Sequence, residues 1–216
     1  MCRCFVSPDA ASVERNFDVT GNGWRFTANF NTTPSQIVPA IRVNDGRTEV
    51  VPMRWGFARR GSFNARVETL ATGTEFRVPW KRGRRCIIPA LGFFEWHVNP
   101  DATEQPYYIH PDDQDVFGFA GLWTRVRADA NSVTESCSII TVPANPLMAK
   151  IHNSGTRMPA MLTREQRKLW LFGPSPGMAL SAYADERLLA YAVSDRINSP
   201  DSNDESLLEP LETDVD

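Results

Sequence analysis

The stretch RCIIPALGFFEWH, at residues 85–97, indicates that this chain is rich in β-strands. Its β-branched and aromatic side chains favour extended backbone, and its Pro and Gly are typical points at which a strand bends or ends. Six further stretches of this kind lie on either side of it. They are residues 24–30 (WRFTANF), 36–43 (QIVPAIRV), 48–55 (TEVVPMRW), 106–111 (PYYIHP), 116–123 (VFGFAGLW) and 136–142 (SCSIITV).

Helix signals are fewer. Residues 12–17 (SVERNF) predict a short helix with Ser12 as its cap. Residues 162–172 (LTREQRKLWLF) predict a better one, because Thr163 can cap it, Gln166 completes a capping box, and a Gly-Pro pair follows. Another short helix is expected within residues 175–190 (SPGMALSAYADERLLA).

These elements together predict an α+β fold. We expect a single compact domain on a curved, mostly antiparallel β-sheet that is barrel-like and carries a few short helices. The domain is expected to span residues 1–198, and residues 199–216 to form an acidic, loosely packed C-terminal tail with seven acidic and no basic residues.

Composition excludes several classes of protein. The 216 residues are 42% hydrophobic and 23% charged, which is typical of a folded globular chain and not of a disordered one. No apolar run approaches the ~18 residues of a membrane-spanning helix, and no secretory signal precedes the first strand. We therefore expect a cytoplasmic monomer that does not bind a membrane.

The four cysteines do not form paired C-x-x-C units, and none of the three histidines lies at ligand spacing from a cysteine. We therefore expect no metal and no cofactor. Cys86 and Cys137 lie in apolar runs and should be buried, reduced thiols. Cys2 and Cys4, in the opening MCRCF, have no such explanation.

Positive charge is concentrated between Arg54 and Cys86, where the sequence has nine Lys or Arg residues and only two acidic ones. The pattern is compatible with a solvated face and equally with a surface that binds phosphates, because clustered cations follow a polyanion backbone. Residue counts alone do not separate the two interpretations.

Three further stretches are unusual for a protein core. FNARVET, at residues 63–69, mixes Asn, Arg and Glu. Glu95 stands between aromatic residues, either as a strand-end charge in water or as a desolvated acid suited to proton transfer. His152 follows an apolar segment and precedes Arg157. A single histidine of this kind is compatible with a structural role as well as a catalytic one.

Read in order, these motifs resemble the SOS response-associated peptidase (SRAP) family. The resemblance rests on the initial MC, NARVET, RRCIIPALGFFEW, AGLW, ANPLMAKIH followed by RMPAML, and YAVSDRIN. It runs from residue 2 to about residue 210. Members of this family process abasic sites in single-stranded DNA as part of the DNA damage and SOS response.

The resemblance implies a role for the first cysteine. Removal of Met1 would give Cys2 a free α-amine beside its thiol. An α-amine has a reference pKa of roughly 7.7–8.0, so much of it is neutral and nucleophilic near neutral pH. It can form a Schiff base with the aldehyde of a ring-opened abasic sugar, and the thiol can then close a thiazolidine ring.

Other roles follow from motif position. Asn64 matches the residue that hydrogen-bonds the sugar, Glu95 the acid near the N-terminal amine, and His152 the histidine that moves protons to and from the sugar oxygen. The expected catalytic residues are Cys2, Asn64, Glu95 and His152. The expected DNA-binding residues are Arg3, Trp55, Arg66, Arg85 and Arg157, with Trp55 as an aromatic on which bases stack.

The chain departs from the family pattern at two places. The usual start is Met-Cys-Gly-Arg-Phe, whereas here Arg3 and Cys4 occupy the Gly and Arg positions. The segment after His152 has three extra residues, among them Gly155, so Arg157 is displaced along the chain. Both departures concern DNA affinity and rate more than the chemistry.

Two other functions stay open at the sequence level. One is an N-terminal-cysteine thiol peptidase or amidase, in which Cys2 attacks a carbonyl with His152 as base. The family name reflects a proposal that its members remove their own leading residue. The other is a non-catalytic module that binds single-stranded DNA. The crosslinking and lyase-type activity on abasic DNA is the interpretation that uses all four expected catalytic residues.

Overall fold

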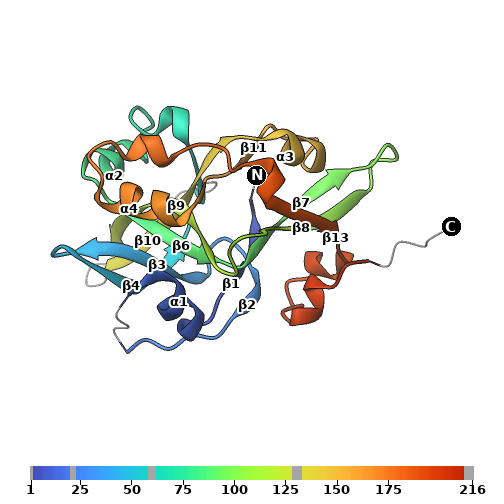
Figure 1. The fold of residues 1–216 in the computed structure, drawn as a ribbon, viewed down its shortest axis with the longest axis horizontal. Helices are drawn as coiled ribbons and strands as arrows, with labels where there is room; N and C mark the ends of the chain where they lie inside the picture. The colour runs from blue at the N-terminus through green and yellow to red at the C-terminus, as the bar shows by residue number, and fades with distance from the viewer. Residues whose placement is uncertain (1, 20–22, 58–61, 128–132, 212–216) are drawn as a thin grey trace.

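A computed structural model describes residues 2–19, 23–57, 62–127 and 133–211 of the chain. It has an α+β fold built on two curved sheets with four short α-helices among the described residues, as Figure 1 shows. The expected fold class is confirmed. No helix in these ranges is long and apolar enough to cross a membrane.

The larger sheet closes on itself. Its ring contains β3 (Ile37–Asn44), β4 (Arg47–Trp55), β6 (Arg85–Ala90), β9 (Phe117–Arg127) and β10 (Val133–Pro143). Neighbours in the ring are antiparallel, except that β10 runs parallel to β4 and thereby completes the barrel. The short strands β5 (Asn64–Arg66), β11 (Arg157–Pro159) and β12 (Met161–Leu162) extend it.

The second sheet has the strand order β13, β8, β7, β1, β2 and is antiparallel throughout. Its members are β1 (Cys4–Ser7), β2 (Asn29–Thr32), β7 (Gly92–Val98), β8 (Glu104–Pro111) and β13 (Leu188–Ala192). The apolar run at 85–97 thus divides at Leu91, and its two halves serve different sheets. Gly92 opens the second half because any Cβ there would collide with the Tyr108 ring.

Aromatic side chains join the two sheets. Phe5 of β1 meets Trp55 and Phe119 of the barrel edge to face, with ring centroids 5.0 and 5.7 Å apart. Phe93 of β7 meets Phe119 at 5.9 Å. Such pairs add to the burial of their large apolar surfaces. Consequently the start of the chain is anchored inside the molecule.

The helices are α1 (Ala10–Phe17), α2 (Arg77–Lys81), α3 (Pro146–Ile151) and α4 (Arg164–Phe172). The capping box of α4 is confirmed, and that helix ends at Gly173. The predicted cap of α1 is wrong: Asp9 caps it, accepting the Ser12 backbone N–H, because the helix begins two residues earlier than the sequence suggested.

Short 3-10 helices connect these elements: η1 (Val67–Thr69), η2 (Pro176–Ala179), η3 (Asp185–Arg187), η4 (Asp195–Asn198) and η5 (Glu205–Leu208). Two of them, η2 and η3, lie where one short α-helix was expected. The predicted strand at residues 24–30 is only partly formed, because β2 begins at Asn29. Trp24 and Phe26 lie before it, with their rings 4.4 Å apart.

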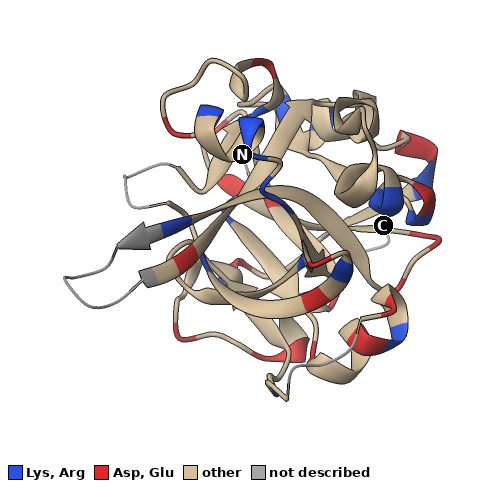
Figure 2. Ribbon diagram, turned by 90° about the vertical axis from the view of Figure 1, so that its left-hand side faces the viewer, with Lys and Arg blue, Asp and Glu red and all other residues tan. Residues whose placement is uncertain are grey.

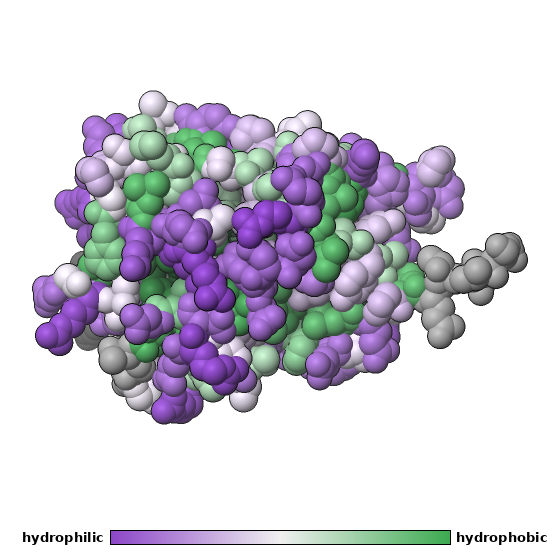
Figure 3. Space-filling model, viewed as in Figure 1, coloured by the Kyte–Doolittle hydropathy of each residue, from purple (hydrophilic) through white to green (hydrophobic). Residues whose placement is uncertain are grey.

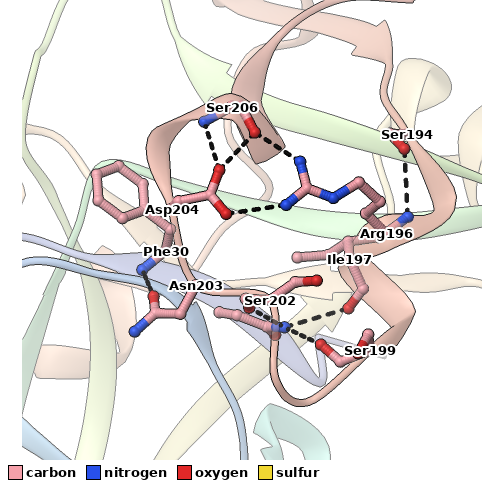
Figure 4. Close-up of polar contacts among 10 residues, drawn as sticks. Phe30, Ser194, Arg196, Ile197, Ser199, Ser202, Asn203, Asp204 and Ser206 are labelled. Atoms are coloured by element: carbon pink, nitrogen blue, oxygen red, sulfur yellow. Dashed lines mark hydrogen bonds and ion pairs between the residues drawn. The ribbon is translucent and has the colours of Figure 1, made fainter.

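The segment 199–211 packs against the second sheet, so the expectation of a loosely packed tail is wrong for these residues (Figure 4). The Asn31 amide of β2 donates to the carbonyls of Ile197, Ser199 and Ser202 at 3.0–3.3 Å. The Asn203 carboxamide accepts the Phe30 backbone N–H, and Leu207 is fully buried. Residues 212–216 lie outside the described ranges.

Candidate functional site

The candidate active site lies where β1 begins beside β7. Cys4 pairs with Phe94 of β7, and the antiparallel register places Cys2 beside the part of β7 that contains Glu95. Cys2 exposes none of its surface. Its carbonyl accepts a hydrogen bond of 2.8 Å from the Asn64 Nδ2 of β5. Two of the expected catalytic residues, 62 positions apart, are therefore in direct contact.

Glu95 and His152 form the other half of the site. Glu95 Oε2 lies 2.8 Å from His152 Nδ1, and both side chains are buried. Side chains alternate along a strand, so Glu95 shares the inner face with Phe93 while its aromatic sequence neighbours point to the other face. The carboxylate accepts from Nδ1–H, which leaves Nε2 as the nitrogen that can exchange a proton with a substrate.

Two contacts that the sequence did not reveal hold α3 against β7. The Asn153 carboxamide accepts the Val98 N–H at 2.9 Å and donates to the Val98 carbonyl at 2.8 Å. His97 Nδ1 lies 3.0 Å from the Lys150 carbonyl. In both contacts one partner is a backbone group, and the sequence does not reveal which backbone groups a side chain will bond. They flank the Glu95–His152 contact and fix the end of α3 that carries the imidazole.

Burial controls the thiols at this site. It raises the pKa of the Cys2 thiol well above its ordinary value, and the charges of Glu95 and Cys4 add to the rise. Burial also raises the pKa of Cys4 to about 12. The Cys4 Sγ–H points to Asn31 Oδ1 at 3.1 Å. At neutral pH both sulfurs are therefore protonated.

Asn64 keeps one polar atom available. Its Nδ2 is engaged by Cys2, but its buried Oδ1 has no hydrogen-bond partner within the described ranges. A buried acceptor without a partner costs about 1–3 kcal/mol. A hydroxyl or amine of a bound substrate can supply the missing donor.

Two of the expected DNA-binding arginines lie beside this site. Arg66 is exposed at the end of β5, on the same side of the strand as Asn64. Arg157 is already occupied: it makes two 2.9 Å contacts with the Glu68 carboxylate and donates to the Thr141 carbonyl at 2.6 Å. This pairing holds the pKa of Glu68 below its usual range.

The others lie elsewhere. Arg3 is half exposed, with its guanidinium 4.1 Å from the Trp96 ring centre and 3.8 Å from Glu104. Arg85 donates to the Leu171 carbonyl of α4 at 3.3 Å, away from Cys2 and its partners.

Trp55 requires a correction. Its ring is fully buried and its Nε1–H donates to the Phe63 carbonyl at 2.9 Å. It cannot offer a face to a DNA base, so the predicted stacking role is wrong. The reason is that β4 turns this position toward the barrel interior, where Phe5 packs on it.

Within the described ranges, no group of three or more His, Cys, Asp or Glu side chains could hold a metal ion. Basic and acidic positions are interspersed on the side of the molecule that Figure 2 shows. On that side, the basic positions therefore do not form one continuous face.

The fold and site define a class: an α+β barrel protein with a cysteine at position 2 beside Asn, Glu and His. The family model of the SOS response associated peptidases (SRAP) matches residues 1–200. The chain belongs to this family, and the relatives that it matches are abasic site processing proteins.

Abasic site processing protein YoqW of Bacillus subtilis (strain 168) is 34% identical over 195 residues, covering 83% of this chain and 85% of that protein. The protein HMCES of Pongo abelii is 26% identical over 238 residues, covering 87% of this chain and 66% of its own length. A crystal structure of a protein from Bacteroides thetaiotaomicron has a TM-score of 0.85 at 27% identity and covers 96% of this chain and 99% of its own.

Proposed function

We propose that this protein captures abasic sites in single-stranded DNA as a covalent thiazolidine on Cys2, after removal of Met1. The observation that carries the proposal is the convergence on Cys2 of three segments far apart in the sequence. Asn64 donates a hydrogen bond to the Cys2 carbonyl. The charge of Glu95 acts on the Cys2 thiol, and Glu95 is in turn paired with His152. Met1 itself lies outside the described residues.

The proposed reaction joins the sugar aldehyde to the aminothiol. The Cys2 amine attacks the aldehyde carbon, and loss of one water gives an imine. The thiol then adds to the imine carbon, forming a C–S bond while its proton passes to the nitrogen. The product is a five-membered ring of S, Cβ, Cα, N and the former aldehyde carbon. Placing both nucleophiles on one residue makes the ring closure intramolecular and fast.

Glu95 and His152 are suited to the proton transfers that these steps need. The amine must lose protons, the carbinolamine oxygen must gain one to leave as water, and the ring-opened sugar oxygen also exchanges protons. The pair lies buried beside Cys2 and is excluded from bulk water. General acid–base catalysis of this kind typically contributes about 10²–10⁴-fold to a rate.

A denaturing gel with abasic single-stranded DNA tests the proposal. The wild type should give a heat-stable adduct, Cys2→Ser none, and Cys4→Ser the full amount, because Cys4 has no α-amine and cannot close the ring. Intact mass should show loss of Met1. An adduct that persists in Cys2→Ser but disappears in Cys4→Ser would overturn the assignment of the nucleophile.

Glu95→Gln and His152→Ala test the division of proton work. Each should slow adduct formation or its reversal roughly 10²-fold while leaving the affinity for undamaged single strands unchanged. Arg66→Ala should instead weaken binding and reduce its salt dependence by one phosphate contact, a slope of about 0.7. Wild-type adduct rates in both site variants would remove Glu95 and His152 from the mechanism.

The state of the thiol argues against the peptidase alternative. A cysteine peptidase needs a thiolate, which is produced by a lowered pKa. Here burial and Glu95 raise the pKa of the Cys2 thiol. Addition to an activated imine tolerates a protonated sulfur, since the proton is needed on the nitrogen in the product.

A further inference from the structure

A second cavity, separate from the Cys2 site, lies between α1, α4 and the turn that joins β3 to β4. Its volume is about 520 Å³, within the range of small-ligand sites. Its lining does not include Cys2, Asn64, Glu95 or His152. In Figure 1, α4 lies above this region and α1 below it, and Figure 3 shows hydrophobic surface between hydrophilic residues on the same face.

The floor of the cavity is apolar and mainly aliphatic. It is formed by Ile41 of β3, Ile87 of β6 and Leu171 of α4. Phe172 stands at the edge with 52% of its surface exposed, one of the few large hydrophobic residues so exposed in the described chain. Exposed apolar surface bordered by polar residues marks binding sites.

Cations surround this floor. Arg47 enters from the β3–β4 turn, and Arg164 and Lys168 from α4; all three are exposed. Within the part of the chain that the structure describes, none of the three is engaged in an ion pair or a side-chain hydrogen bond, although Arg164 interacts electrostatically with its neighbour Glu165. Asp18 is the single acidic lining residue. The cations of the lining outnumber its acids, and the mouth therefore carries a net positive charge.

Arg167 completes the wall and is held rigidly. It is buried, and it donates to the Asn16 carbonyl, the Gln114 side chain and the Val116 carbonyl at 2.6–2.9 Å. Its guanidinium lies 4.1 Å from the ring centre of Phe17 and covers it. Burial lowers its pKa to about 10, so it remains charged at neutral pH.

The helix α4 orders these features along one direction. Arg164 and Lys168 are four residues apart and lie on one face, and Leu171 and Phe172 continue that face one turn later. A ligand lying along α4 meets cations first and apolar surface afterwards. Arg47 lies on the opposite wall, so a ligand that also neutralises this cation needs a second negative group.

We propose that this cavity binds an acidic peptide segment that carries a bulky apolar side chain, supplied by a partner protein. Several carboxylates would meet Arg47, Arg164 and Lys168, and the apolar side chain would enter the aliphatic floor. Nucleic acid fits less well, since bases stack on aromatic faces, whereas the floor is aliphatic and the Phe17 ring is covered by Arg167. Phe172 at the edge is the one aromatic lining residue that is not covered in this way. This proposal does not depend on the chemistry at Cys2.

Fluorescence anisotropy with a labelled peptide Glu-Asp-Glu-Asp-Leu-Phe tests it, using the full-length protein. Binding should saturate and weaken about tenfold in Arg164→Glu/Lys168→Glu, because two attractive exposed contacts become repulsive. Phe172→Ala should weaken it as well. The control Arg15→Glu reverses an exposed charge on α1 outside the cavity and should bind like wild type. Abasic-site crosslinking should be unchanged in all of these variants.

Two control probes separate the peptide from simpler explanations. A peptide with Ser-Ser in place of Leu-Phe should bind much more weakly, because only the charges remain. Single-stranded DNA should not displace the labelled peptide. The proposal is overturned if the original peptide does not saturate, if the double charge reversal binds it like wild type, or if DNA competes with it as well as unlabelled peptide does.

Discussion

At the scale of single residues, Gly155 explains how the segment after His152 fits against the imidazole. Its N–H donates to the His152 carbonyl at 2.9 Å, and its Cα lies against the imidazole. A Cβ at this position would approach His152 Nε2 and lie 2.7 Å from Cδ2. The backbone there is not left-handed, so the need for glycine is one of space beside the ring.

We therefore expect Gly155→Ala to displace the imidazole from Glu95 or to cover Nε2. Adduct formation on abasic single-stranded DNA should slow by about tenfold or more, and its pH–rate profile should shift, since the histidine leaves its carboxylate partner. Binding of undamaged strands should stay at the wild-type level.

Gly177→Ala is the matched control, since nothing lies within 4 Å of the added methyl group. It should leave both rate and pH profile unchanged. A Gly155→Ala protein with the wild-type pH profile would show that the imidazole adapts and that the contact has no positioning role.

At the scale of elements, Asn31 of β2 connects β1, the strand that follows Cys2, to the C-terminal segment. Its Oδ1 accepts from the Cys4 thiol of β1. Its Nδ2 donates to the carbonyls of Ile197, Ser199 and Ser202, which Figure 4 labels. One buried carboxamide thereby ties together three parts of the chain. The acidic segment is held by these backbone contacts and by an exposed ion pair of 3.0 Å between Asp204 and Arg196.

We expect Asn31→Ala to destabilise the fold by about 1–3 kcal/mol, because the buried carbonyls and the thiol lose their partner. Chemical denaturation measures the loss. Removal of residues 200–216 should lower stability similarly, since the buried Leu207 is lost with it. Asn99→Ala serves as the control, because Asn99 bonds only within an exposed hairpin; equal losses in both Asn variants would contradict the role of Asn31.

At the scale of the whole molecule, four buried thiols make stability sensitive to alkaline pH. Burial raises the pKa of Cys2, Cys86 and Cys137 and brings that of Cys4 to about 12. The unfolded chain releases these protons near pH 8.5, whereas the folded chain retains them. The stabilisation that these buried thiols contribute is thus fully present below about pH 8.5. It is lost as the pH rises toward their raised pKa values in the folded protein.

Each thiol should contribute a decrease of up to about 1.4 kcal/mol per pH unit above pH 9. Denaturation at pH 8, 9 and 10 under reducing conditions measures it. Cys86→Ala should give a shallower dependence on pH, whatever its effect on stability at pH 8. A slope identical to that of the wild type would show that the Cys86 thiol does not titrate on unfolding.

Local patterns in the sequence were sufficient to predict much of the secondary structure and part of the core of this protein. The capping box of α4, the strands at 37–44 and 47–55 and the buried Cys86 and Cys137 all depend on near neighbours, so periodicity and cap residues predict them. The ordered set of motifs was sufficient to name the family and the residues of the candidate site, because the order of residue types survives when their contacts are unknown.

Only the tertiary structure decided which of these residues meet. Asn64 reaches Cys2, and His152 reaches Glu95, across the junction of a closed barrel and a second sheet, and no local period encodes such a contact. The same holds for Trp55, which the barrel buries, and for Arg157, which Glu68 occupies. Whether a side chain faces solvent, DNA or the core depends on strands far away in sequence, and therefore on the fold as a whole.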